Sequence, residues 1–166
     1  MALRSDLSVR CAFTLTGTSE VVAPVYGPIM RYEKIHETGT SASQNDLLFV
    51  DETKSFTGTT AQDIDLAGSL TGQLGGTVTF VEITGMLIIV KTTTSGVTLS
   101  VGGKASNTFI NWVAAANDEV VVQADGCFLL TAPVDGYAVT ASTGDILELT
   151  PSATLDATVA FWGRSA

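Results

Sequence analysis

The chain has 166 residues, of which 45% are hydrophobic and only 15% are charged. This composition excludes a disordered polar chain, and the length is enough for one domain with its own hydrophobic core. The 17 acidic and 8 basic residues give a net charge of −9. We therefore expect no nucleic acid among the partners, because phosphate binding needs a basic surface. The longest apolar stretch, Met86–Val90, is too short to span a bilayer, so we also expect no membrane partner.

Residues 1–36 are predicted to form an extended arm. They contain two prolines and scattered apolar residues, without a sustained helical or two-residue period. Short strands are expected at Cys11–Leu15 or Val21–Val25. Residues 1–34 carry four basic and three acidic side chains, a net charge of +1, whereas the other 132 residues carry four basic and 14 acidic ones, −10. Such an arm can dock on an acidic neighbour, including another copy of the chain, although an ordinary surface segment has the same composition.

Residues 37–76 form a transition between the arm and the rest of the chain. The sequence indicates a polar loop at 37–46, a strand at 47–52 and a short strand at 63–66. In residues 66–76 leucines recur every four positions, as they do on one face of a helix, but four glycines oppose a helix. A loop or a single helical turn is predicted there.

From Thr77 to Trp162 the chain is a series of short β-type runs separated by glycine turns. This spacing is typical of a β-sandwich or barrel. We predict an all-β fold, with a jelly-roll-like β-sandwich as the body over residues 37–166 and the extended N-terminal arm before it. The runs 86–91 and 127–131 are apolar on both faces, so we expect both to be central strands.

Turn and alternation signals define two further features of the body. Asp135-Gly136 predicts a hairpin between its flanking runs, because glycine accepts the positive φ that such turns need. The last run alternates in the way that a half-buried strand does. The residues expected on its inner face are Leu155, Ala157, Val159 and Phe161.

Two cysteines, Cys11 and Cys127, lie far apart in the sequence. Cys127 stands inside an apolar run and is predicted to be a small buried core residue, and Cys11 can have the same role. Spacing alone does not decide whether the two form a disulfide, but a reducing compartment is the more natural setting.

Few residues in this sequence suggest chemistry. His36 is the only histidine, and we expect it at the surface rather than as a general base. Carboxylates occur close together at 51–52, 63–65 and 118–119. Solvated charges at turns or strand ends explain them more simply than an acid–base pair or a metal site does. We therefore predict that the protein is not an enzyme and has no catalytic residue, no cofactor and no metal.

Exposed aromatic and basic residues are the candidates for assembly contacts. Trp112 lies outside the clear strands, and we favour a lid over the core rather than an interface anchor for it. Apolar residues of the arm must be buried against the body or against a neighbouring subunit. The candidate assembly contacts are Arg4, Arg10, Tyr26, Arg31, Tyr32 and Trp112.

Residues 47–166 resemble virion structural proteins of tailed bacteriophages in their order of turns and strands. The similar elements are Gly-Gly followed by Ala-Ser-Asn and Phe (102–109), Asp-Gly before Leu-Leu (125–130), Ala-Pro before Gly-Tyr-Ala-Val-Thr-Ala (132–141), and Thr-Gly-Asp (143–145). The closing strand ends in glycine, as it does in that set. Within the set, the chain resembles capsid decoration, or cement, proteins.

The resemblance implies a non-enzymatic protein that binds and stabilises the capsid surface. Its partners would be the major capsid protein and other copies of itself, as a homo-oligomer whose simplest form is a trimer at a threefold position. It would be made in the host cytoplasm and reside on the virion. The alternatives are a tail, head–tail connector or head-fibre component, or a carbohydrate-binding β-sandwich module that stacks sugars on Trp112, Tyr137 and Trp162.

Overall fold

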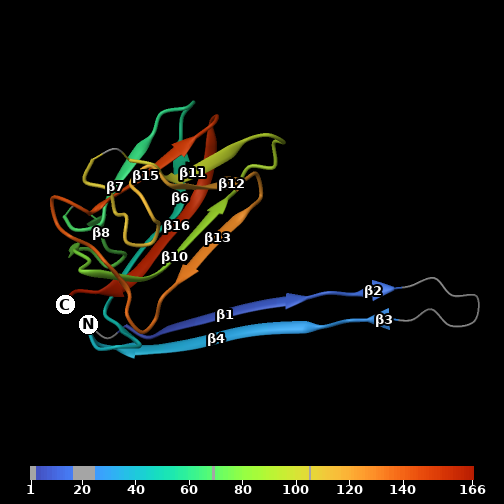
Figure 1. The fold of residues 1–166 in the computed structure, drawn as a ribbon, viewed down its shortest axis with the longest axis horizontal. Coiled ribbons are helices and arrows are strands. Elements are labelled where there is room, and N and C mark those ends of the chain that lie inside the picture. The colour runs from blue at the N-terminus through green and yellow to red at the C-terminus, as the bar shows by residue number, and fades with distance from the viewer. Residues whose placement is uncertain (1–2, 17–24, 69, 105) are drawn as a thin grey trace, which may run out of the picture.

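The computed structural model of the chain describes residues 3–16, 25–68, 70–104 and 106–166 (Figure 1). Within these ranges the chain is all-β, as predicted, and forms a β-sandwich from which a long two-stranded arm projects. No described segment forms a helix that is long and apolar enough to cross a membrane.

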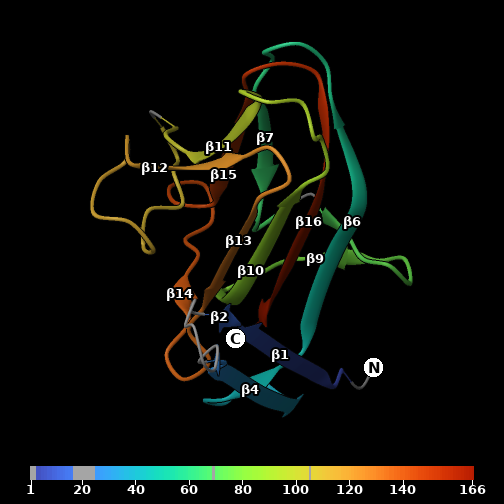
Figure 2. The ribbon, with the colours of Figure 1, turned by 90° about the vertical axis from the view of Figure 1, so that its right-hand side faces the viewer.

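The sheet nearer the arm, here called the arm-side sheet, has five strands. Its four main strands are, in spatial order, β13 (Cys127–Thr131), β10 (Glu82–Val90), β16 (Leu155–Arg164) and β6 (Leu47–Phe56). The fifth, β14 (Tyr137–Ala138), pairs with the beginning of β10. All pairings in this sheet are antiparallel. Figure 2 looks onto the sheet from the side toward which the arm projects.

The second sheet of the sandwich, here called the far sheet, is also antiparallel. Its strands are, in spatial order, β12 (Glu119–Gln123), β11 (Thr98–Gly102), β15 (Ile146–Pro151) and β7 (Gln62–Asp65). From β6 onward the chain moves from one sheet to the other at nearly every step. Among the described strands of the two sheets, only β11 and β12 are successive and pair with each other.

The core lies between the two sheets and is built by alternation along each strand. Met86, Ile88 and Val90 of β10 have no exposed surface, and Leu99 and Val101 of β11 face them from the far sheet in the same buried state. Complete burial of one such side chain contributes about 1.5–3 kcal/mol relative to leaving it in water.

Three sequence predictions for the body are confirmed. The predicted strands at 47–52 and 63–66 correspond to β6 and β7. Of the predicted central run 86–91, residues 86–90 fall on β10, which is central in its sheet. The residues predicted for the inner face of the last run are all buried: Leu155, Ala157, Val159 and Phe161.

Two predictions about residues 127–136 are wrong. Strand β13 is not central but forms an edge of the arm-side sheet. Asp135-Gly136 does not form a hairpin either, because β13 and β14 both pair with β10 along the same side. The dipeptide instead lies in a loop that interrupts this edge, where Gly136 has the expected positive φ of 68° and its N–H donates to Ala132 O at 2.9 Å.

Residues 66–76 are largely a loop, as predicted, but they also contain a strand. The two-residue strand β8 (Leu70–Thr71) pairs with β9 (Thr77–Val78) in a small hairpin. Leu70 and Val78 of this hairpin are buried and belong to the core, which explains part of the leucine spacing without a helix.

The arm is a paired ribbon rather than a single extended strand. Its long strands are β1 (Ser5–Ala12) and β4 (Ile29–Thr38), and further out the short strands β2 (Leu15–Thr16) and β3 (Val25–Tyr26) continue the pairing. The short strand expected near Cys11–Leu15 falls on this ribbon, whereas most of the alternative at 21–25 lies outside the described residues. Strand β5 (Gln44–Asn45) pairs in parallel with the end of β4 and leads the chain into the body.

Candidate assembly surface

The arm has one apolar and one polar face, because side chains alternate along a strand and directly opposed residues share a face. The opposed pairs Val9–Tyr32 and Cys11–Met30 lie on one face, whereas Ser8–Glu33 and Arg10–Arg31 lie on the other. The second face is more polar, although it also exposes Ile29 and Ile35. We call the first the apolar arm face, made of Leu7, Val9, Cys11, Met30 and Tyr32, with Lys34 opposite Leu7 at its base. The sequence-based statement that the arm lacks a two-residue period is therefore wrong for β1.

Most of the large apolar side chains that the described residues expose lie on the arm. Eight of thirteen such side chains belong to it, and they include Met30 with 58% and Tyr26 with 68% of their surface exposed. A ribbon of two strands has no second layer to cover its apolar side. Exposed apolar surface of this extent is typical of a surface that binds another molecule.

The arm-side sheet also has an apolar outer face, which is turned away from the core. Ladder pairing places Leu87 beside Ala160 and Leu129, and Ile89 beside Cys127. We call this the outer face, made of Leu48, Val50, Leu87, Ile89, Leu129, Ala160 and Trp162. Most of these side chains are half-buried, although a solvent-facing side of an antiparallel sheet is normally polar.

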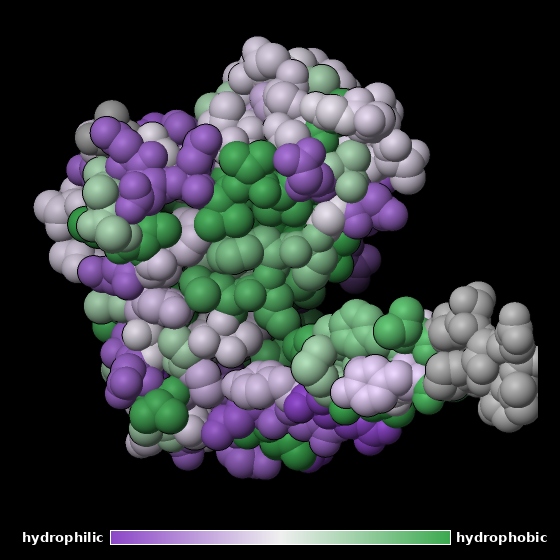
Figure 3. All heavy atoms as spheres, turned by 45° about the vertical axis from the view of Figure 1, so that its right-hand side comes forward, coloured by the Kyte–Doolittle hydropathy of each residue, from purple (hydrophilic) through white to green (hydrophobic). Residues whose placement is uncertain are grey.

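The outer face and the apolar arm face enclose a recess, here called the notch. Figure 3 shows hydrophobic residues on the body above the recess and on the arm below it. At the corner where the arm leaves the body, Leu7 and the outer-face residues Leu48, Leu87 and Trp162 line a cavity of about 140 Å³. The two apolar faces are therefore continuous through this corner.

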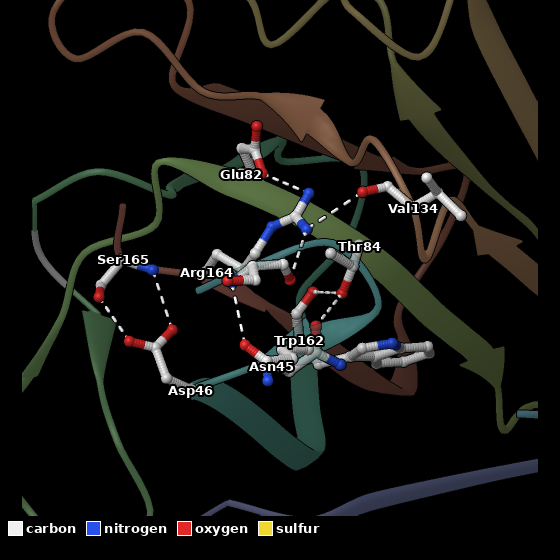
Figure 4. A network of polar contacts seen from close by, with 10 residues as sticks. Asn45, Asp46, Glu82, Thr84, Val134, Trp162, Arg164 and Ser165 are labelled. Carbon is white, nitrogen blue, oxygen red and sulfur yellow. Dashed lines mark hydrogen bonds and ion pairs between the residues drawn. The ribbon is translucent and has the colours of Figure 1, made fainter. Parts of the chain in front are cut away.

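A chain of buried polar contacts fixes the arm to the body. His36 Nδ1 lies 3.3 Å from Ser5 Oγ across the ribbon, and Asn45 Nδ2 donates to the same hydroxyl at 3.2 Å. Thr84 Oγ1 of β10 in turn donates to Asn45 Oδ1 at 2.6 Å (Figure 4). His36, Asn45 and Thr84 are each at most 1% exposed. Because these polar groups are buried and bonded to one another, the base of the arm has a defined position.

Arg164 fastens the loops beside the base of the arm. Its buried guanidinium forms an ion pair with Glu82 and donates from Nη1 to Ser41 O at 3.0 Å and to Val134 O at 3.1 Å (Figure 4). One cation thus ties the loop after β4 to the loop that interrupts the sheet edge. A guanidinium suits this position because it presents several donors in a rigid plane.

Five of the six candidate assembly contacts lie on the arm. Arg10 and Arg31 are opposed across the polar face, both exposed, and neither forms an ion pair within the described part of the chain. Arg4 forms an ion pair with Glu37 at 3.7 Å. Tyr32 lies on the apolar arm face, and Tyr26 of β3 continues the ribbon outward.

Trp112, the sixth candidate, lies on the body. It packs against the core, its ring is tilted against that of Phe128, and its Nε1 donates to Phe109 O at 2.9 Å. These contacts are those of a lid over the core, the role favoured from the sequence. Tyr137 also packs against the core, and the ring of Trp162 lies over Gly85, so the three aromatics do not form one stacking surface.

His36 is not at the surface, contrary to the prediction. Burial, and secondly the nearby Lys34, lower the pKa of His36 below its usual value. A serine hydroxyl stands beside it, but His36 Nε2 has no hydrogen-bond partner among the described residues. In a Ser–His–Asp site, the imidazole nitrogen that does not contact the serine is hydrogen-bonded to a carboxylate. The pair therefore has the geometry of a structural contact.

The carboxylates that stand close together in the sequence are engaged in local contacts. Asp63 accepts from Lys104 Nζ at 2.6 Å, Asp65 accepts from Ala67 N at 3.0 Å, and Asp118 accepts from Ala115 N at 2.8 Å. The pocket of about 280 Å³ beside the β8–β9 hairpin contains Asp46 as its one titratable group. No group of three or more potential metal ligands is found among the described residues.

Both cysteines are exposed and free, so the prediction of a buried Cys127 is wrong. Cys127 stands opposite Ile89 on the outer side of the arm-side sheet, because the inner positions of β13 are taken by Phe128 and Leu130. Cys11 lies on the apolar arm face. The two thiols therefore lie on the two walls of the notch.

Comparison with known proteins gives no relative. No protein-family model matches the chain, and neither a curated protein nor a solved structure matches it significantly. Function is therefore inferred from the residues of this chain.

Proposed function

We propose that the protein is a non-enzymatic structural component of a phage virion that binds the capsid surface as a decoration protein. The observation that carries this proposal is the arm, which projects from a rigid β-sandwich and exposes apolar and basic side chains. A protein that reinforces a shell acts by covering junctions between subunits, and it needs contact surface rather than a reactive site.

The polar face of the arm supplies the contact with the shell. Arg10 and Arg31 stand directly opposite each other, an arrangement that costs free energy in an isolated ribbon because like charges repel. An acidic surface on the major capsid protein would remove this cost and add charge-assisted hydrogen bonds. The acidic body of the chain, by contrast, suits contact with the surrounding solvent.

The strand order supports the jelly-roll class as part of the same proposal. One sheet has the order β6-β16-β10-β13 and the other β7-β15-β11-β12. This is the order in which an eight-stranded double Greek key divides its strands between two sheets. We assign the body to that class, which is common among proteins of viral shells.

Analysis of purified particles tests this proposal. Quantitative mass spectrometry of virions of the phage that encodes the chain should find it in hundreds of copies, and electron microscopy should place it on the outer shell. Absence from the particles would overturn the proposal. A few copies per particle would also overturn it, in favour of a tail, connector or head-fibre component.

The contact itself is tested with charge variants of the arm. Replacing Arg10 and Arg31 by serine should weaken the binding of purified protein to shells that lack it, because the basic pair is lost while the ribbon keeps its pairing. The matched control replaces Lys54 and Lys91 of the body by serine and should bind like the wild type. Equal binding by all three proteins would contradict a role for the arginine pair.

A further inference from the structure

The apolar arm face is separate from the arginine pair and needs a different partner. Leu7, Val9 and Cys11 of β1 and Met30 and Tyr32 of β4 form it, and Met30 and Tyr32 keep 58% and 43% of their surface exposed. The outer face of the sheet, on the other wall of the notch, is likewise without a covering layer. One ligand placed in the notch would contact both walls (Figure 3).

We propose that the notch is filled by the arm of a second copy of this chain. The arm leaves from one end of the arm-side sheet and projects outward on the side of the outer face, so each chain has the outline of a bracket with one apolar inner corner (Figures 1 and 3). Two brackets related by a twofold axis interlock, because the arm of each enters the notch of the other. The two apolar arm faces then pack on each other, and the outer part of each arm lies against the partner's outer face. Such an interface uses the same surface twice, as closed dimers do.

The distribution of charge directs contact between two copies of the chain to their arms. The chain as a whole carries −9, so two copies repel each other wherever their bodies meet. Residues 4–38 carry four basic and four acidic side chains, a net charge of zero. Contact through the arms therefore joins the least acidic parts of the two chains.

The number of matching surfaces on each chain favours a second copy as the occupant of the notch. Each chain contributes one projecting apolar ribbon and one notch that fits a ribbon, so self-association covers all of this surface. A foreign partner that filled only the notch would leave Tyr26 and Phe13 of the outer arm exposed at 68% and 53%. This inference does not depend on capsid binding, which uses the opposite face of the arm.

Two neighbouring residues of β4 provide a matched test. Met30 and Ile29 are exposed to similar degrees, 58% and 52%, but lie on opposite faces of the arm. Light scattering coupled to gel filtration should give the wild type and Ile29→Asp at least twice the mass of the 17.2 kDa chain. Met30→Asp should shift to the mass of one chain, because a carboxylate would be buried between the two arms. A monomeric wild type, or equal masses for all three proteins, would overturn the proposal.

The native cysteines test the position of the second arm. A copy with Cys127→Ser carries only the thiol on the apolar arm face, and a copy with Cys11→Ser carries only the thiol on the outer side of the sheet. When the two are mixed, a bifunctional maleimide can join Cys11 to Cys127 only between different chains. The proposal predicts this cross-link, identified by peptide mass spectrometry, and its loss when both copies also carry Met30→Asp. An oligomer that forms without this cross-link would show that the copies associate through another surface.

Discussion

At the scale of single residues, His36 has the clearest link between burial and stability. Its side chain is enclosed at the base of the arm, where burial and the nearby Lys34 hold its pKa below the ordinary value of 6.5. In the unfolded chain the same imidazole takes up a proton near pH 6.5. Below that pH the unfolded state binds more protons than the folded state, so the folded state loses stability as the pH falls.

Replacing this histidine should remove that part of the pH dependence. We expect wild-type protein to lose more free energy of unfolding between pH 7.5 and pH 5.5 than His36→Gln does. The difference should be at most about 1.4 kcal/mol. This is the limit for one proton over one pH unit, because only the unit between pH 6.5 and pH 5.5 lies below the pKa of histidine in the unfolded chain. Urea unfolding of both proteins at the two pH values measures it. Identical losses would show that His36 takes up its proton equally well in the folded chain.

The residues that sequence reasoning misplaced are those whose surroundings depend on strand register. His36 stands beside a polar loop in the sequence, but its pairing with Ser5 turns it toward the body. Cys127 belongs to an apolar run, yet register places it on the outer side of an edge strand. Composition indicates that such a run is partly buried, but it does not indicate which side each residue faces.

At the scale of elements, β10 and β16 are coupled by a close contact on the outer face. Gly85 of β10 lies opposite Trp162 of β16, and a Cβ atom at Gly85 would lie 2.1 Å from the indole ring. The indole therefore lies flat over the strand because glycine leaves room for it. This contact also explains why β10 tolerates a glycine in its interior, where the residue normally weakens a strand.

Gly85→Ala should displace the tryptophan ring and destabilise the protein. The expected loss is about 1–3 kcal/mol of unfolding free energy, the usual cost of overpacking a filled site. In a Trp162→Ala background the same substitution should cost much less, because the obstructing ring is absent. Chemical denaturation of the four proteins in this double-mutant cycle measures the coupling. Additive effects of the two changes would mean that the ring has another position available at no cost.

The positions of the strands could be predicted better from the sequence than the way in which the strands pair. The strands of the body follow from apolar runs and turn residues, and β6, β7, β10 and β16 occur where the sequence predicts them. The misread hairpin at Asp135-Gly136 shows the limit of a local signal, since a turn dipeptide also fits a loop inside an interrupted edge. The alternation in β1 was readable from residues 7–11 and would have indicated an amphipathic ribbon.

At the scale of the whole molecule, the arm and the body are separate contributors to function and to stability. The arm is fixed at its base by Ser5 and His36, while none of the described residues further out belongs to the core cluster. The all-β sandwich could be predicted from composition and turn spacing. The notch could not, because it depends on the angle at which the ribbon leaves the sheet, and no local pattern encodes that angle.

Shortening the arm should separate assembly from folding. Leu7 and Lys34 are directly paired, so replacing residues 8–33 by Asn-Gly closes a shorter hairpin. This variant keeps the contacts of Ser5 with His36 and Asn45 at the base of the arm. We expect a monomer that no longer binds shells and whose thermal midpoint stays within about 5 °C of wild type. Deleting residues 1–34 instead removes Ser5 and leaves the buried Asn45 without one partner, so this variant should unfold at lower temperature. If the shortened chain unfolds as well, the outer arm is part of the folded core.

The alternation of the chain between its two sheets has a consequence for how the protein is made. Strand β6 is synthesised early, but its only ladder partner in the arm-side sheet is β16, at the other end of the chain. The sandwich therefore cannot close until β16 has been synthesised, and pairing between such distant segments is slow. The arm, whose strands are closer in sequence, leaves the ribosome before the body does. Its apolar face is therefore exposed on the nascent chain before the body that carries the notch has folded.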